Sequence, residues 1–206
     1  MVTKSITQDQ ICQAALQIIT TKGLDKLSMR NLAEKLQIQA PSLYQHIHNK
    51  SHLIELIQAY SFKAYHLVGD LNPDCPSWQE YIYQILQNMR QFFVKNPALF
   101  KLFAAYSANS PEARQTFESF LQTMLQYGFS LSQASHIGRA MRIYVLGHVQ
   151  FELSSLEQGN YPLIDPQFPL NYRFFMLDGG YNHHESFEFG AQLLIAGCEK
   201  LLEANQ

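Results

Sequence analysis

Apolar residues recur along most of the chain with the three- and four-residue spacing of amphipathic helices. The clearest early example places four apolar residues on one helical face: Ile11, Ala15, Ile18 and Ile19. Thr7 and Gln10 have the spacing of a capping box at the start of this helix, and Gly23 is a suitable residue to end it. No segment alternates with the two-residue period of a strand, so we predict an all-α protein.

Two short helices and a tight turn are indicated next. Ser28 can cap the short helix SMRNLAEKL, and a break of four residues leads to another short helix that begins at Pro41. This arrangement is typical of a helix-turn-helix, whose second helix fits the major groove of DNA. We expect Leu43 and Ile47 to face a small core, because they are one helical turn apart. A packed pair of helices without a DNA-binding role is the alternative.

A longer helix is expected to begin at Asn49 or Ser51 and to run to Leu67. Five further helices are predicted over residues 77–95, 97–106, 110–127, 130–157 and 185–203. Residues 159–183 interrupt the helical pattern with glycines and prolines, and we expect a long aromatic loop there. These elements predict a helix-turn-helix domain over residues 1–52 and a larger helical domain for ligand binding and dimerisation over residues 53–206.

The charge is distributed unevenly between these two domains. The chain has a net charge of −2, yet residues 1–52 carry six basic and three acidic side chains. A basic head on an acidic body favours contact with a polyanion such as DNA. The polar start MVTKSITQDQ has no apolar run of a signal peptide, and no stretch has the roughly 18 apolar residues of a membrane span. We therefore expect a cytoplasmic protein that does not enter a membrane.

The stretch LYQHIHNK, residues 43–50, is the most specific motif of the sequence. With the preceding SMRNLAEKLQIQAPS, it resembles the DNA-binding domain of the TetR family of bacterial repressors. The resemblance continues through SWQEY at residue 77 to FGAQLLIAGCEKLL at residues 189–202, which are similar to the tetracycline-repressor subclass. It implies that seven residues lie at positions that contact DNA: Arg30, Ala40, Pro41, Ser42, Tyr44, His46 and Lys50.

Two positions in the head depart from the family pattern. Gln37 occupies a turn position that is usually glycine, where a left-handed backbone would cost about 1 kcal/mol. Ala40 stands where the tetracycline repressor has a base-reading amide, and its methyl group is limited to apolar contacts such as the thymine methyl. The operator sequence therefore does not follow from the resemblance.

The resemblance also implies a ligand chamber in the second domain. The corresponding positions are occupied by His66, Ile85, Met89, Phe103, Tyr106, Phe120 and Phe151. Among them, Phe103 replaces a metal-binding histidine and Ile85 replaces an amide. A chamber of this composition favours an apolar or aromatic ligand and needs no metal or other cofactor. Filling of an ordinary core is the alternative for each of these rings.

Other chemistry finds little support in the sequence. The HxHxxxH run of His46, His48 and His52 and the cluster His183-His184-Glu185 could suggest a metal. A solvated or phosphate-facing cluster is the preferred interpretation of the first, since a helix boundary near Lys50 separates its members. The chain contains no GxSxG, GxGxxG or P-loop motif, so we do not expect an enzyme.

Small and apolar residues in the last two long helices favour a dimer interface. Gly190, Leu194, Gly197 and Leu201 share one face of the final helix, and Ile137, Met141, Tyr144, Val145 and His148 form a stripe in the preceding one. We therefore expect a homodimeric transcriptional repressor that binds a pseudo-palindromic operator and is released by a small-molecule effector. A regulator without an inducer, an activator, and a helical enzyme or carrier that reuses the fold are the alternatives.

Overall fold

The computed structural model describes residues 6–64, 75–106, 110–158, 165–176 and 182–203, and this part of the chain is helical without a strand. The prediction of an all-α fold is confirmed. The chain divides into two compact units, residues 1–75 with 91–123, and residues 76–90 with 124–206. This division follows the packing of the helices; the domain boundary after residue 52 stays a prediction.

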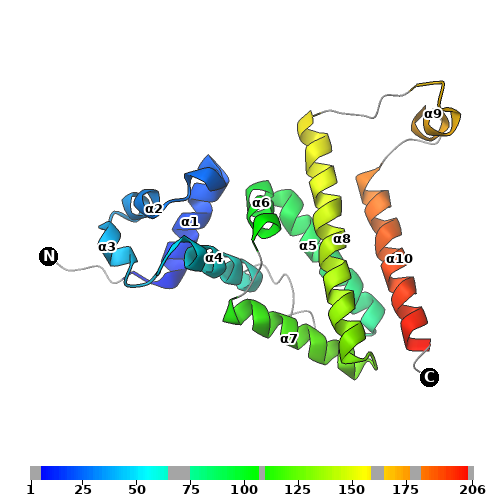
Figure 1. Ribbon diagram of the computed structural model, residues 1–206, viewed down its shortest axis with the longest axis horizontal. Coiled ribbons are helices and arrows are strands. Elements are labelled where there is room, and N and C mark those ends of the chain that lie inside the picture. The colour runs from blue at the N-terminus through cyan, green and yellow to red at the C-terminus, as the bar shows by residue number, and fades with distance from the viewer. Residues whose placement is uncertain (1–5, 65–74, 107–109, 159–164, 177–181, 204–206) are drawn as a thin grey trace. The chain divides into compact units, whose positions relative to one another are not determined.

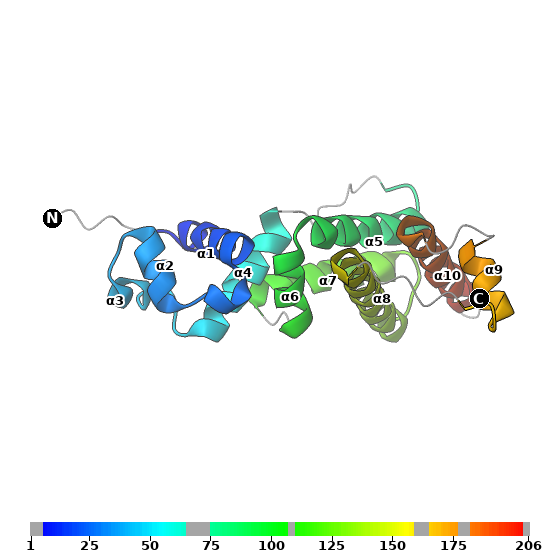
Figure 2. The ribbon, with the colours of Figure 1, turned by 90° about the horizontal axis from the view of Figure 1, so that it is seen from above.

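The first unit contains the head of the chain (Figures 1 and 2). Its helices are α1 (Gln8–Lys22), the 3-10 turn η1 (Leu24–Lys26), α2 (Met29–Leu36), α3 (Ala40–Leu43), α4 (Lys50–Ala64), α6 (Pro97–Ala105) and most of α7 (Pro111–Gln126). Helix α1 is central, since it packs against α2, α4 and α6. Aliphatic side chains of residues 11–57 with an exposed fraction of 1% or less form a core in this unit: Ile11, Ile19, Leu27, Leu32, Leu43, Ile47, Leu53 and Ile57.

The second unit contains the long helices α8 (Leu131–Gln158) and α10 (His183–Glu203), which pack side by side (Figure 1). It also contains α9 (Pro169–Met176) and the first part of α5 (Trp78–Lys95). Phe187 on α10 is fully buried, and its ring contacts Tyr144 and His148 of α8 at centroid distances of 5.3 and 5.1 Å. This aromatic contact joins the two long helices of the unit.

Side-chain and glycine caps mark several helix ends in the structure, including those predicted for the first helix. Thr7 and Gln10 form a reciprocal capping box at the start of α1, and Gly23 ends the helix with a φ of +88°. Ser130 and Gln133 form a second reciprocal pair before α8. Because these side chains satisfy backbone N–H groups that have no partner inside the helix, the helix starts could be read from local sequence.

The expectation of an uninterrupted loop over residues 159–183 is wrong for part of this segment. Helix α9 occupies residues 169–176 within it, and Pro169 is the first residue of the helix. Proline suits a first turn, because its missing N–H would have had no helical partner there. The last helix likewise begins before residue 185, since the Asn182 side chain accepts hydrogen bonds from the backbone N–H groups of His184 and Glu185. None of the described helices has the length and hydropathy needed to cross a bilayer.

Candidate DNA-binding and ligand-binding sites

The helix-turn-helix is built from α2, a tight turn and the single helical turn α3. Ser28 caps α2 by accepting the backbone N–H of Asn31 at 3.1 Å. Helix α3 is shorter than the sequence suggests. Beyond its end, the backbone N–H groups of His46 and Ile47 donate to the carbonyl of Leu43, so the chain continues in a hydrogen-bonded turn. Leu43 and Ile47 are both fully buried, as predicted. These two anchors fix the orientation of the segment between them.

Gln37 adopts the left-handed conformation at the turn, with φ 56° and ψ 38°. It is the only non-glycine residue with positive φ in the described part of the chain. The backbone N–H of Ile38 then reaches the carbonyl of Ala33 at 3.0 Å, which closes the end of α2. The expected strain at this position is therefore present.

The predicted DNA-contacting residues remain at least partly exposed. Tyr44 exposes 52% of its surface, and Arg30, Pro41 and Lys50 are also exposed. The other members of the set are half-buried: Ala40, Ser42 and His46. Asn49 caps α4 by accepting the backbone N–H of His52 at 2.9 Å, which places Lys50 at the first position of that helix. The head thus presents a surface of polar and aromatic side chains, which the buried residues Leu43 and Ile47 hold in place.

His48 and His52 pack against each other beside this surface. Their rings stack with centroids 4.8 Å apart, and Nδ1 of His52 accepts the backbone N–H of His48. Within the described residues, no group of three His, Cys, Asp or Glu side chains is arranged to hold a metal ion. The stacked rings stabilise the segment that connects α3 to α4.

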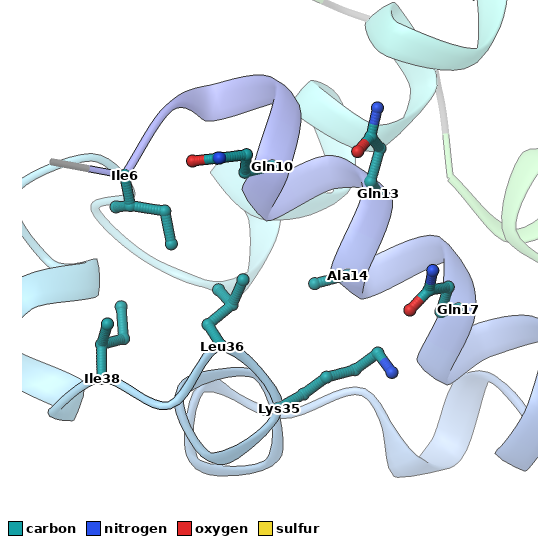
Figure 3. A pocket seen from close by; sticks show the side chains of 8 residues that line it. All are labelled: Ile6, Gln10, Gln13, Ala14, Gln17, Lys35, Leu36 and Ile38. Atoms are coloured by element: carbon teal, nitrogen blue, oxygen red, sulfur yellow. The ribbon is translucent and has the colours of Figure 1, made fainter. Parts of the chain in front are cut away.

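A groove of about 300 Å³ lies on the α1 side of the head (Figure 3). Ile6, Leu36 and Ile38 form apolar parts of its wall, and Gln10 and Lys35 contribute polar side chains. None of the predicted DNA-contacting residues lines it. This groove is thus separate from the candidate DNA-binding surface.

In the first unit, Phe103 belongs to a cluster of phenylalanine rings. It is 4% exposed and makes edge contacts with Phe62 of α4 and with Phe92 and Phe93 of α5, at centroid distances of 5.3, 6.3 and 5.3 Å. Phe120 of α7 is 3% exposed and stacks on Phe117. The surroundings of Phe103 are therefore apolar and aromatic.

Tyr106, at the end of α6, is connected to α4 through Gln58. The side chain of Tyr106 is 39% exposed, whereas Gln58 is fully buried. Nε2 of Gln58 donates a hydrogen bond to the backbone carbonyl of Tyr106 at 3.1 Å. Together with the contact between Phe62 and Phe103, this bond ties the end of α6 to α4. Sequence reasoning missed Gln58, because a glutamine in a helix is usually exposed.

The remaining ligand candidates lie in the second unit or outside the described residues. Ile85 and Met89 are buried on α5, and Phe151 on α8 is 52% exposed with an edge contact to His183 at 5.9 Å. His66 lies outside the described residues. The described ligand-binding candidates are thus divided between the two compact units, and their assignment to one ligand site stays a prediction.

A buried polar cluster in the second unit also escaped sequence reasoning. Arg90 of α5 donates two hydrogen bonds of 2.9 Å to the carboxylate of Glu152 on α8. His148 lies one helical turn from Glu152, with 3.7 Å between Nδ1 and Oε2. Arg90 also stands 5.0 Å from the ring centroid of Phe187. Because 62 residues separate Arg90 from Glu152, no local pattern could reveal this pair.

The buried thiols have no features of catalytic nucleophiles. Burial, with a smaller contribution from Asp9, raises the pKa of Cys12 to about 12. Burial and the nearby Glu199 raise the pKa of Cys198 to about 11. Both side chains are therefore protonated near neutral pH, whereas a nucleophilic cysteine acts as the thiolate.

Comparison with protein families accounts for both parts of the chain. The model described as "Bacterial regulatory proteins, tetR family" matches residues 11–57. The model described as "Tetracyclin repressor-like, C-terminal domain" matches residues 72–163. This chain belongs to the TetR family. The helix-turn-helix is accordingly the DNA-binding part of a TetR-family transcriptional regulator.

Individual TetR-family proteins align along nearly the whole chain. Tetracycline repressor protein class E of Escherichia coli is 26% identical over 198 residues, which cover 96% of this chain and 93% of that protein. An HTH-type transcriptional regulator of Saccharopolyspora erythraea is 28% identical, covering 93% of this chain and 84% of the relative. ActR of Streptomyces coelicolor, solved in complex with actinorhodin, has a TM-score of 0.76 and 24% identity, covering 94% of this chain and 97% of ActR. The fold is thus shared over both units.

Proposed function

We propose that this TetR-family regulator is a homodimeric repressor that leaves its operator when a small apolar or aromatic ligand binds. The observation that carries the proposal is the surface around Tyr44, which is exposed between the buried anchors Leu43 and Ile47. Tyrosine can contact both bases and phosphates, and Lys50 adds a positive charge at the start of α4. The seven predicted contact residues are proposed to meet DNA through this surface.

Exposed apolar stripes on α8 and α10 support the dimer. The stripe on α8 contains Ile143, Gly147 and Phe151, and the stripe on α10 contains Phe189, Leu193, Gly197 and Leu201. The stripes predicted from the sequence partly face the interior of the chain instead. Ile137, Met141 and Val145 of α8 are buried, and on α10 Gly190 lies against Tyr144 of the same chain and Leu194 is half-buried. A second copy of the chain would cover the exposed stripes and present two recognition helices to a two-fold operator.

Ligand response is supported by the contacts between α4 and α6. Helix α4 packs against α1 in the head and receives two contacts from the end of α6, at Phe103 and Tyr106. A ligand that displaces Phe103 or Tyr106 would therefore act directly on the helix that follows the recognition segment. Release from DNA requires the ligand to bind the DNA-free conformation more tightly than the DNA-bound one.

Solved structures of related proteins support a small-molecule effector. ActR was solved with actinorhodin, and a single-site variant of TetR from Acinetobacter baumannii AYE was solved with minocycline. In this chain, the rings of Phe62, Phe92, Phe93 and Phe103 form an apolar cluster, which favours ligands with an aromatic or otherwise apolar surface.

The DNA-binding part can be tested with the full-length protein and double-stranded DNA selected from a random library. Selection should enrich a sequence with two-fold symmetry, and Tyr44→Ala should weaken binding to it by about 10-fold or more. Lys50→Ala should lower the magnitude of the salt slope by about two, one phosphate contact for each subunit. The matched control is Lys101→Ala, an exposed lysine on α6 outside the proposed surface. Failure to enrich any sequence, or unchanged binding in both head variants, would contradict the proposal.

A further inference from the structure

His148 lies in a closely packed aromatic environment between α8 and α10. Its side chain is 6% exposed. The ring makes edge contacts with Phe187 and His183 of α10, at centroid distances of 5.1 and 6.3 Å, and a tilted contact with Tyr144 of α8 at 6.0 Å. An imidazole is therefore part of the packing that holds the start of α10 to α8.

Four ionisable groups face this ring, from α5, α8 and α10. Glu152 and Tyr144 belong to its own helix, Arg90 belongs to α5 and His183 belongs to α10. Glu152 is the group that would stabilise an imidazolium, but its carboxylate already receives two hydrogen bonds from Arg90. A proton on His148 would thus create a second positive charge beside a carboxylate that already has a partner.

Neutral His148 suits this position better than the charged form. Burial lowers the pKa of His148, and Arg90 and His183 lower it further, while Glu152 and the backbone at His183 act in the opposite direction. Neither ring nitrogen makes a hydrogen bond of normal geometry within the described part of the chain. Burying a charge without sufficient partners is costly, so the packed state favours the neutral ring.

We propose that His148 is an acid-sensitive contact between α8 and α10, which holds the start of α10 when neutral and releases it when protonated. Protonation would place a positive charge among Phe187, Arg90 and His183, and an outward movement of α10 would let water solvate that charge. The proposal concerns packing inside the second unit and does not depend on DNA, on a ligand or on dimer formation.

The direction of the pH dependence follows from the lowered pKa. Above the ordinary histidine pKa of 6.5, both the folded and the unfolded chain carry a neutral ring, and the stability is fully present. Below that pH the unfolded chain gains a proton that the folded chain does not accept. Stability is therefore lost as the pH falls from 6.5 through the lower folded pKa. One linked proton decreases the folding equilibrium constant by at most about tenfold per pH unit in that window.

Trp78 offers a local probe for the first experiment, because it is the single tryptophan and lies buried in the same unit. Urea unfolding of the full chain would be followed by its fluorescence between pH 8 and pH 5, at one protein concentration. We expect the unfolding free energy of the wild type to fall with pH more steeply than that of His148→Phe. The difference between the two slopes should correspond to at most one linked proton. His136→Gln is the matched control, since His136 is an exposed histidine of the same helix, and it should keep the wild-type slope. Equal slopes in wild type and His148→Phe would overturn the proposal.

A second measurement uses the wild type alone and is needed if His148→Phe does not fold. Histidine ring resonances would be titrated by NMR, and amide hydrogen exchange would be measured at residues 183–188. We expect one ring to titrate below the others and exchange at the start of α10 to accelerate as that ring becomes protonated, with no matching change in α1. Exchange at residues 183–188 that stays constant through this titration would overturn the proposal, as would the absence of a ring that titrates below 6.5.

Discussion

The amide of Gln58 donates a hydrogen bond to the backbone carbonyl of Tyr106 at 3.1 Å, and this bond fastens the end of α6 to the middle of α4. Gln58 is fully buried, and its side-chain oxygen has no hydrogen-bond partner in the described part of the chain. One half of the amide thus holds the helix end while the other half remains unsatisfied. This arrangement makes Gln58 important for stability through its shape and its donor together.

Truncation of Gln58 separates these contributions. Gln58→Ala should lower the free energy of unfolding by about 2 kcal/mol, because it leaves a cavity and removes the donor to Tyr106. Gln58→Leu keeps most of the volume and removes the unsatisfied oxygen, so its loss should be smaller, under about 1 kcal/mol. Urea unfolding of both variants measures the difference. Equal losses of unfolding free energy in the two variants would mean that the packing of the Gln58 side chain contributes little to stability.

Substitution of Gln37, the left-handed residue of the turn, is expected to raise the stability of the protein rather than lower it. Gln37→Gly should stabilise the head by about 1 kcal/mol, since glycine adopts φ 56° without the steric cost of a Cβ atom. The control is Gln39→Gly, because Gln39 has an ordinary extended backbone with φ −79° and ψ 141°. Glycine should give no gain there. Thermal unfolding checks both, and a destabilised Gln37→Gly variant would contradict the strain argument.

Gly190 allows α10 to approach α8 closely. A Cβ atom at this position would lie 2.6 and 2.7 Å from two ring carbons of Tyr144. That ring is held by its hydroxyl group, which donates to the carbonyl of Phe187 at 2.7 Å. Gly190→Ala should therefore destabilise the second unit by roughly 1–3 kcal/mol. Gln192→Ala, at an exposed position of the same helix outside the apolar stripe, is the control, and unfolding measurements should show no loss.

The proposed dimer interface can be tested on the same helix. Gly197→Arg should leave the subunit folded, because the site is open within the chain, but it should produce monomers by placing a charge in the interface. Operator binding should fall with dimer formation although the head is unchanged. Gln192→Arg, an exposed position outside the apolar stripe, is the control for the added charge. Sedimentation at low micromolar concentration gives the answer, and a Gly197→Arg dimer would place the interface elsewhere.

The residue at position 103 predicts the response to tetracycline with magnesium. The family resemblance places a metal-binding histidine there, whereas this chain has a phenylalanine that packs against Phe62, Phe92 and Phe93. Phenylalanine offers no ligand to magnesium, and Ile85 and Phe120 offer no hydrogen bonds to a polar drug edge. Two unmade hydrogen bonds would weaken binding by about two orders of magnitude or more. Operator release at submicromolar drug and millimolar magnesium would contradict this prediction.

Local sequence was sufficient where the cause of a structure is local. The capping box of Thr7 and Gln10 and the buried pair Leu43 and Ile47 depend on residues within a turn or two of each other. The left-handed backbone at Gln37, in contrast, was indicated by the family resemblance. The glycines and prolines of residues 159–183 predict a loop, yet helix α9 begins at Pro169, because proline also favours a first helical turn. The start of α2 and the buried residues of the helix-turn-helix were therefore predictable from local sequence, whereas α3 is shorter than the sequence suggests.

The buried polar contacts were decided by the tertiary structure. Gln58 meets Tyr106 across 48 residues, and Arg90 meets Glu152 across 62. The period of a helix tells which residues share a face, but it does not tell which other helix covers that face. For that reason the sequence determined the helices, their caps and the DNA-binding motif. Only the packing of the helices decided which polar side chains are buried, which partners they have, and that the exposed stripe of α8 follows Ile143, Gly147 and Phe151.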